Sequence, residues 1–225
     1  MTQRKVVTID GPAGAGKSTV ARQLAHRLGW SFLDTGAMYR VVTLVALEAE
    51  ADLENDHVLV EITDTIQPRF VDGHVFVGDR DVSAEIREPR VTRAARYAAG
   101  NPGVRERLVH WQRAAAEFHD LVTEGRDQGT IVFPDALVKF FLEASDEERA
   151  MRRFRELIAK GHDIEYEEIL ADQRRRDQED RTRAIAPMLP AEDARFIDST
   201  GKSLEEVLDE MTRVIHPLLT SITGE

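Results

Sequence analysis

The chain has no cysteine, and this absence excludes two kinds of site. Without thiols there is no disulfide framework and no thiolate-bound metal, a usage that suits a reducing compartment such as the cytoplasm. The seven histidines are scattered along the chain, and none falls into the spacing of a zinc site. A G-x-S-x-G nucleophile elbow is missing as well. The sequence therefore does not indicate a thiol, zinc or serine-elbow enzyme.

Long apolar runs are also missing, so no stretch approaches the length of a membrane span. Polar residues lead directly into the first apolar segment, and we expect no signal peptide. Lysine and arginine total 30 against 41 aspartates and glutamates, and the net charge of −11 argues against general attraction to nucleic acid. We expect a cytoplasmic protein that binds neither membranes nor nucleic acid. The high net charge and the lack of a coiled-coil seam favour a monomer.

The strongest positive signal is a glycine-rich stretch, GPAGAGKST, which follows a β-branched run at 5–10 and precedes a helical pattern at 20–28. The spacing G-x-x-x-x-G-K-S between a strand and a helix is typical of a phosphate-binding loop. In such a loop, Lys17 would reach the β- and γ-phosphates of a nucleotide and Ser18 would hold Mg²⁺. A glycine-rich turn with a chance lysine is the alternative, and the flanking strand and helix argue against it. The predicted nucleotide-binding residues are Gly11, Pro12, Ala13, Gly14, Ala15, Gly16, Lys17, Ser18 and Thr19.

Strand-like and helix-like segments alternate along the chain, which predicts an α/β fold. In addition to the first strand, strands are expected at 31–34, 121–124, 138–142 and 195–198. Helical patterns lie at 37–48, 90–97, 104–118 and from Ser203 onward. This alternation implies a mainly parallel five-stranded sheet with helices on both faces. We expect a single P-loop core over 1–225, in three layers, that carries two smaller additions.

The first addition is a β-rich insertion at about 56–88. Apolar and polar residues alternate at 67–79 around Asp72-Gly73, and an Asp-Gly pair in that setting is typical of a hairpin turn. A hairpin inside a β-α-β series indicates a small inserted subdomain.

The second addition is a highly charged helical hairpin at about 146–186. A capping box, Ser145-x-x-Glu148, marks its beginning. Three of its arginines would share one helix face because of their i, i+3 and i+4 spacing: Arg149, Arg152 and Arg153. The hairpin is either a solvated, salt-bridged surface or a mobile lid that closes arginines over phosphates. We favour the lid, because phosphoryl transfer needs additional cations and the exclusion of water.

A phosphate-binding loop alone does not separate a kinase from a GTPase or an ATP-driven motor. The chain is short for a motor, and the Asn/Thr-Lys-x-Asp motif with which GTPases read guanine is missing. Several separated arginines could instead serve a second phosphate group: Arg40, Arg105, Arg126 and Arg183. Two phosphate-bearing substrates brought together is the layout of a nucleotide kinase.

Longer segments resemble bacterial cytidylate (CMP) kinases, of the P-loop nucleoside monophosphate kinase family, over essentially the whole chain. The matching segments, in order, are IDGPAGAGKST at 9–19, LDTGAMYR at 33–40, DVSAEIR at 81–87, EGRDQGTIVFPDA at 124–136, SDEERAMRR at 145–153 and RRRDQEDRTRAIAP at 174–187. The resemblance implies transfer of the γ-phosphoryl group of ATP, bound with Mg²⁺, to CMP or dCMP in pyrimidine nucleotide metabolism.

The resemblance also implies roles for residues outside the loop. The CMP phosphate would be bound by Arg40, Arg126 and Arg183. The cytosine would be read by Arg105 and Asp127, the ribose held by Asp180, and the monophosphate pocket lined by Thr35 and Tyr39. Lid groups approaching the ATP phosphates would be Arg176 and the Arg149, Arg152 and Arg153 cluster. The implied catalytic residues are Lys17, Arg126, Arg176 and Arg183.

Two positions depart from the family pattern. Arg96 stands where a serine usually contacts the base, and Gln128 stands where an aliphatic residue or methionine is usual. Rival interpretations are a kinase for UMP or shikimate, and a regulator that binds ATP or GTP without phosphoryl transfer. The choice between CMP and dCMP, the tolerance of UMP, the choice between ATP and GTP, and the carboxylate of the Mg²⁺ shell, Asp10 or Asp34, stay open at this point.

Overall fold

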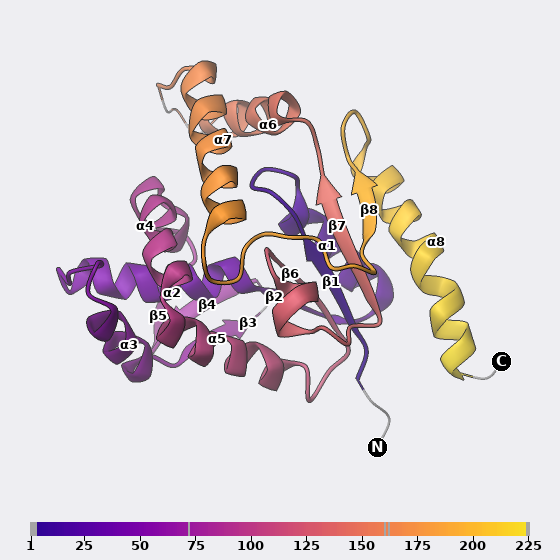
Figure 1. Ribbon diagram of the computed structural model, residues 1–225, viewed down its shortest axis with the longest axis horizontal. Coiled ribbons are helices and arrows are strands. Elements are labelled where there is room, and N and C mark those ends of the chain that lie inside the picture. The colour runs from indigo at the N-terminus through magenta and orange to yellow at the C-terminus, as the bar shows by residue number, and fades with distance from the viewer. Residues whose placement is uncertain (1–3, 72, 160, 162, 224–225) are drawn as a thin grey trace. The chain divides into compact units, whose positions relative to one another are not determined.

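The computed structural model describes residues 4–71, 73–159, 161 and 163–223. The chain forms two compact units (Figure 1). Unit 1 comprises Met1–Leu33 and Ala116–Glu225, and unit 2 comprises Asp34–Ala115. None of the described helices is both long and apolar enough to cross a bilayer.

Unit 1 is built on a five-stranded sheet in the order β2-β6-β1-β7-β8. Its strands are β1 (Val6–Asp10), β2 (Ser31–Asp34), β6 (Leu121–Gly125), β7 (Val138–Glu143) and β8 (Arg195–Asp198). Strand β1 runs parallel to both β6 and β7, and β7 runs parallel to β8. The predicted α/β fold with a parallel five-stranded sheet is therefore confirmed.

One face of this sheet carries the main hydrophobic core. Alternate residues of β1, Val7 and Ile9, are fully buried with those of β7, because successive strand residues point to opposite faces. Helices α1 (Lys17–Leu28) and α8 (Leu204–Thr223) pack on this face through Leu24 and Met211, among others. Each large apolar side chain buried here contributes about 1.5–3 kcal/mol. The core thus fixes where β1 ends and α1 begins.

The opposite face of β1 is polar. Thr8 and Asp10 are buried there, and the Asp10 carboxylate accepts hydrogen bonds from the backbone N–H groups of Gln128 (2.9 Å) and Gly129 (2.8 Å). Both belong to η2 (Gln128–Val132), a single π-helical turn in which the Phe133 N–H donates to the Gln128 carbonyl. π-helical turns of this kind occur frequently at functional sites.

Unit 2 combines a helical core with a small antiparallel sheet. Its elements are α2 (Thr35–Glu48), α3 (Asp56–Thr65), β3 (Pro68–Val71), β4 (His74–Val77), β5 (Arg80–Asp81), η1 (Glu85–Arg87), α4 (Pro89–Gly100) and α5 (Pro102–Ala115). The predicted hairpin is present as β3 paired antiparallel with β4, and β5 adds a third strand. Asp72 of its turn lies outside the described residues, and Gly73 has a φ of 83°. Helix α3 opens the segment that we expected to be β-rich, and the pattern had not indicated it.

The charged hairpin of unit 1 is helical, as predicted. Helices α6 (Asp146–Ala159) and α7 (Tyr166–Thr182) lie next to each other in Figure 1, and Lys160 between them lies outside the described residues. They share a small apolar cluster that includes Leu157 and Ile169. The Ser145 hydroxyl accepts from the Glu148 N–H at 3.2 Å, whereas the Ser145 N–H donates to Thr200. The capping box therefore forms only its first half. We refer to this helix pair as the lid, after the function that we expected from the sequence, which stays a prediction.

Candidate nucleotide-binding site

The glycine-rich loop joins β1 to α1 at the carboxyl edge of the sheet. Gly11 has a φ of 143°, and a Cβ there would lie 2.1 Å from the Leu142 carbonyl oxygen, so only glycine fits. Gly16, with a φ of 90°, caps helix α1 and has no side chain to accept from its first N–H groups. Free N–H donors at a helix N-terminus, together with the helix dipole, favour an anion. The loop thus has the backbone form that phosphate binding requires.

Lys17 is buried at the base of this loop, with 5% of its surface exposed. Its Nζ donates to the Pro12 carbonyl at 2.8 Å. Burial, and next the positive charge of Arg126, lower the Lys17 pKa to about 7, although the carboxylates of Glu124 and Asp10 act in the opposite direction. Burial therefore disfavours the charged form of Lys17 in the free protein, and the phosphates of a nucleotide would favour it.

A second cationic group follows β6 and the end of α7. Arg126 Nε lies 2.8 Å from Asp180 Oδ2, and Arg183 Nη1 lies 3.7 Å from Asp180 Oδ1. Burial disfavours the charged form of Arg126, but the ion pair with Asp180 outweighs it and keeps the pKa above its usual value. For Arg176, burial and then the charge of Arg126 lower the pKa. The structure therefore brings Lys17, Arg126, Arg176, Asp180 and Arg183 into one electrostatic group.

Asp127 and Gln128, which follow Arg126 in the chain, are both buried, with 4% and 1% exposed. The Asp10 pKa is raised to about 6, mainly by burial, while hydrogen bonds from Gly129 and Gln128 act against the rise. The Thr123 hydroxyl donates to the Gln128 side-chain oxygen at 3.0 Å. The departure at Gln128 thus fits its polar surroundings.

Unit 2 holds the remaining predicted residues at the N-terminus of α2. The Asp34 carboxylate accepts from the Ala37 N–H at 2.8 Å and lies 3.5 Å from Arg40 Nη2 and 3.8 Å from Arg87 Nη2. Arg40 Nε is buried and has no hydrogen-bond partner among the residues that the structure describes. Thr35, the residue after Asp34, is buried. This end of α2 therefore holds two guanidinium groups against one carboxylate.

The other two predicted residues of unit 2 contact each other. The Arg105 guanidinium lies 5.8 Å from the centre of the Tyr39 ring and donates to the Ala99 carbonyl at 3.4 Å. Arg105 is 5% exposed, so its position is fixed by packing. Arg96 is instead exposed, with its guanidinium over the Tyr97 ring. The departure at Arg96 therefore places a surface residue at that position.

The three lid arginines have different partners, so the shared helix face does not gather their guanidinium groups. Arg149 is buried and donates to the Ala13 carbonyl of the loop at 2.7 Å. Arg152 donates to the Ser199 carbonyl at 2.9 Å, and Arg153 pairs with Glu156 at 2.8 Å. Of the three, Arg149 hydrogen-bonds to the loop, and it does so through the Ala13 backbone carbonyl.

The donor groups around the loop fit a magnesium ion that is held largely by phosphates. Ser18 lies in the first turn of α1, and the Asp10 and Glu124 carboxylates are buried near enough to Lys17 to influence its pKa. Hard oxygen groups of this kind suit Mg²⁺, which keeps waters and phosphate ligands rather than a full protein cage. No cluster of three or more possible ligands from His, Cys, Asp and Glu occurs in the described part of the chain. Both Asp10 oxygens already accept backbone N–H groups, so Ser18 is the better placed ligand.

Sequence reasoning missed several residues that the structure places at these groups. Asp177 and Gln173 of α7 contact the Ala13 peptide, and Arg87 contacts Asp34. The Asp177 and Gln173 contacts bridge 164 and 160 residues, so local periodicity gives no sign of them, although Asp177 lies in RRRDQEDRTRAIAP, a segment that carried the family resemblance. Arg87 lies in DVSAEIR, a segment that carried the family resemblance, and this was an available signal.

Comparison with known proteins agrees with this geometry. The profile of the cytidylate kinase family matches residues 7–217. Cytidylate kinases from Klebsiella pneumoniae and Rhodopirellula baltica are 47% and 48% identical to the chain, covering 91% and 93% of it and 92% of each relative. An uncharacterized protein from Eubacterium ventriosum shares the fold, with a TM-score of 0.55 at 12% identity over 95% of this chain and 99% of that one. The chain belongs to the cytidylate kinase family.

Proposed function

We propose that the chain transfers the γ-phosphoryl group of ATP to CMP or dCMP, giving ADP and CDP or dCDP. The observation that carries the proposal is Lys17, a buried lysine at the base of a phosphate-binding loop, in one electrostatic group with Arg126, Asp180 and Arg183. A regulator that only binds a nucleotide has little use for this additional cationic group. Membership in the cytidylate kinase family supports the choice of acceptor.

The reaction is an in-line displacement at the γ-phosphorus. An oxygen of the CMP phosphate forms the new P–O bond, the bond from the γ-phosphorus to the bridging oxygen breaks, and ADP leaves with that electron pair. The attacking phosphate is already ionised, so no general base is required. Lys17, Arg126, Arg176 and Arg183 neutralise the charge on the phosphates and hold them in line.

The acceptor is bound by the other predicted residues. Arg40, Arg126 and Arg183 bind its phosphate, and Thr35 and Tyr39 line the pocket for that phosphate. Arg105 and Asp127 read the cytosine, whose exocyclic amine is a donor that suits a carboxylate. Asp180, which pairs with Arg126, accepts a ribose hydroxyl.

Ser18 would hold Mg²⁺ beside the phosphates of the nucleotide, where the ion would supply positive charge against the charge that they carry. The residues of the loop bind and orient the phosphates around it.

The test is acceptor-dependent release of ADP, measured in a coupled assay with CMP, dCMP, UMP, AMP and shikimate. We expect turnover with CMP and dCMP, and a loss of several orders of magnitude in Lys17→Met with the fold intact by circular dichroism. Lys139→Met is the matched control, because Lys139 is also buried (9% exposed) but pairs with Asp193. No acceptor-dependent ADP from the wild type would favour the regulator, and near-normal turnover by Lys17→Met would exclude the proposed role of Lys17.

We also propose that the chain works as a monomer in the cytoplasm. The absence of cysteine and the net charge of −11 support this. Light scattering coupled to size-exclusion chromatography would contradict it by giving a mass of twice 25.4 kDa.

A further inference from the structure

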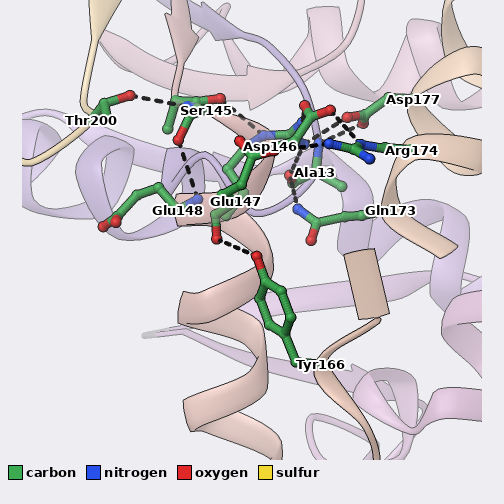
Figure 2. A network of polar contacts seen from close by, with 12 residues as sticks. Ala13, Ser145, Asp146, Glu147, Glu148, Tyr166, Gln173, Arg174, Asp177 and Thr200 are labelled. Atoms are coloured by element: carbon green, nitrogen blue, oxygen red, sulfur yellow. Dashed lines mark hydrogen bonds and ion pairs between the residues drawn. The ribbon is translucent and has the colours of Figure 1, made fainter. Parts of the chain in front are cut away.

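One residue of the phosphate loop, Ala13, is held by the lid through both its backbone N–H and its backbone carbonyl. The Ala13 carbonyl accepts from Arg149 Nη1 at 2.7 Å and from Gln173 Nε2 at 2.9 Å. The Ala13 N–H donates to Asp177 Oδ1 at 3.3 Å. Figure 2 shows Gln173 and Asp177 from α7 directed at Ala13. The loop is therefore attached to both lid helices by hydrogen bonds from one residue.

The charged groups that hold Ala13 form a buried ion pair. Arg149 Nη1 lies 2.6 Å from Asp177 Oδ2, and their side chains are 2% and 5% exposed. The remaining nitrogens of Arg149 donate to the Ala144 carbonyl at 3.1 Å and to Asp146 at 2.5 Å. These bonds fix the guanidinium to the point where β7 leads into α6. Because a buried pair contributes little net stability over apolar residues of similar size, stability alone does not account for it.

The loop also packs closely against the same side chains. A Cβ at Gly14 would lie 2.6 Å from Gln173 Nε2 and 3.2 Å from the Arg149 Cβ. Gly14 has a φ of 78°, in the left-handed region. A shift of Arg149 or Gln173 would therefore move the Ala13–Gly14 peptide and the N–H groups that follow it.

A second set of ion pairs joins the two lid helices; it shares Asp146 with Arg149, but its removal leaves the Arg149 bonds to Ala13 and Asp177 in place. Arg174 of α7 pairs with Asp146 and Glu147 of α6, each at 2.9 Å, and these side chains are between 42% and 63% exposed. Arg174 lies one residue from Gln173 in the same helix (Figure 2). It ties α6 to α7 and so offers a control for effects of lid stability alone.

We propose that Arg149, Gln173 and Asp177 are positioning residues that fix the two peptide groups on either side of the Ala13 Cα, and with them the phosphates of the nucleotide donor, from the lid. This rests on the proposed function only for the identity of the donor. It gives Arg149 a role different from the direct phosphate contact expected from the sequence. Since a misplacement of about 1 Å can reduce a rate about 100-fold, these residues act on turnover without touching substrate.

The experiment compares Arg149→Lys, Asp177→Asn and Gln173→Met with the control Arg174→Met. Titration calorimetry measures the Kd of ADP without acceptor, and steady-state assays measure kcat and the KM of each substrate. We expect kcat/KM for ATP to fall about 10- to 100-fold in the first three variants, with a weaker Kd for ADP. The KM of CMP, and all constants of Arg174→Met, should stay within about twofold of wild type.

A double variant separates positioning from stability. Arg149→Met with Asp177→Leu removes both charges, which restores folding stability if the pair only packs α6 against α7. We expect it to melt near the wild type yet keep the weak ADP binding, because Ala13 still lacks two of its three partners, Arg149 and Asp177. Wild-type ADP binding by this variant would overturn the proposal, as would an equal loss in Arg174→Met. If the wild type binds ADP but phosphorylates no acceptor, the proposed function fails, and the ADP-binding test of the positioning residues still stands. If Asp177→Asn does not fold, the result for Gln173→Met decides, because that substitution leaves no charge unpaired.

Discussion

Nucleotide binding should draw a proton from solvent, because Lys17 is largely neutral above pH 7 in the free protein. Burial and the charge of Arg126 hold its pKa at about 7. At pH 8 about one molecule in ten then carries the proton, by the usual titration relation. Phosphates placed against Nζ favour the charged form and return the pKa toward or above its ordinary value. Binding of ADP at pH 8 should therefore take up most of a proton, about 0.9 for a pKa of 7. At pH 6 Lys17 is already charged and the terminal phosphate of ADP, with a second pKa near 6, releases a proton of its own, so the net uptake should vanish or change sign.

Titration calorimetry in buffers of different ionisation enthalpy measures this uptake directly. ADP is titrated in the presence of EDTA at pH 6, 7 and 8, and the slope of the observed enthalpy against the buffer enthalpy gives the number of protons. At pH 8 the phosphates are already ionised, so their own release is small. Lys17→Arg keeps a permanent charge and should abolish the uptake. An uptake below about 0.2 proton at pH 8 in the wild type, or an equal uptake in Lys17→Arg, would refute the reasoning.

Further predictions concern the loop, the polar face of β1 and the acceptor residues. Gly11→Ala should lower the free energy of unfolding by about 3 kcal/mol or more, because its Cβ would meet the Leu142 carbonyl; Gly29→Ala, with open space around it, should cost only about 1 kcal/mol, as urea unfolding can check. Burial raises the Asp10 pKa from 3.8 to about 6, so between these two pH values the folded protein binds more protons than the unfolded chain. The free energy of unfolding should therefore fall as the pH rises from about 4 to 6. Asp10→Asn should flatten that slope in urea titrations at several pH values, and an unchanged slope would contradict the assignment. Arg105→Met should raise the KM of CMP at least about tenfold and leave the Kd of ADP unchanged, whereas a parallel loss of ADP binding would contradict a role in base recognition.

The parts of the fold that sequence predicted well are those that local rules determine. Periodicity and glycine spacing indicate the strand before Gly11 and the helix after Lys17. The alternation of strands and helices indicates that the strands of the sheet run parallel. The hairpin of β3 and β4 was predicted for the same reason, since alternation and turn residues lie within one short segment.

The parts that it missed depend on contacts between distant segments. The spacing of Arg149, Arg152 and Arg153 determines which helix face they share, but the groups packed against that face decide where each guanidinium points. Arg149 is directed by Ala13, 136 residues away, and Asp10 by Gln128, 118 residues away. The π-helical turn η2 is formed by hydrogen bonds from backbone N–H groups to the carbonyls of Asp127 and Gln128. Because these bonds involve no side chain, the sequence carries no signature of the turn.

The chain connection between the two units has a consequence for the order in which the protein folds during synthesis. Unit 2 is one continuous segment, Asp34–Ala115, and all of it emerges from the ribosome before β6, the partner of β1. Strand β1 therefore cannot pair with β6, in which Leu121 lies opposite Val6, until that part of the chain has been synthesised. A collapsed unit 2 shortens the effective loop between them and reduces the entropy lost when it closes. We expect the inserted unit to form first, and the sheet that carries the phosphate loop to be completed only when the second half of the chain arrives.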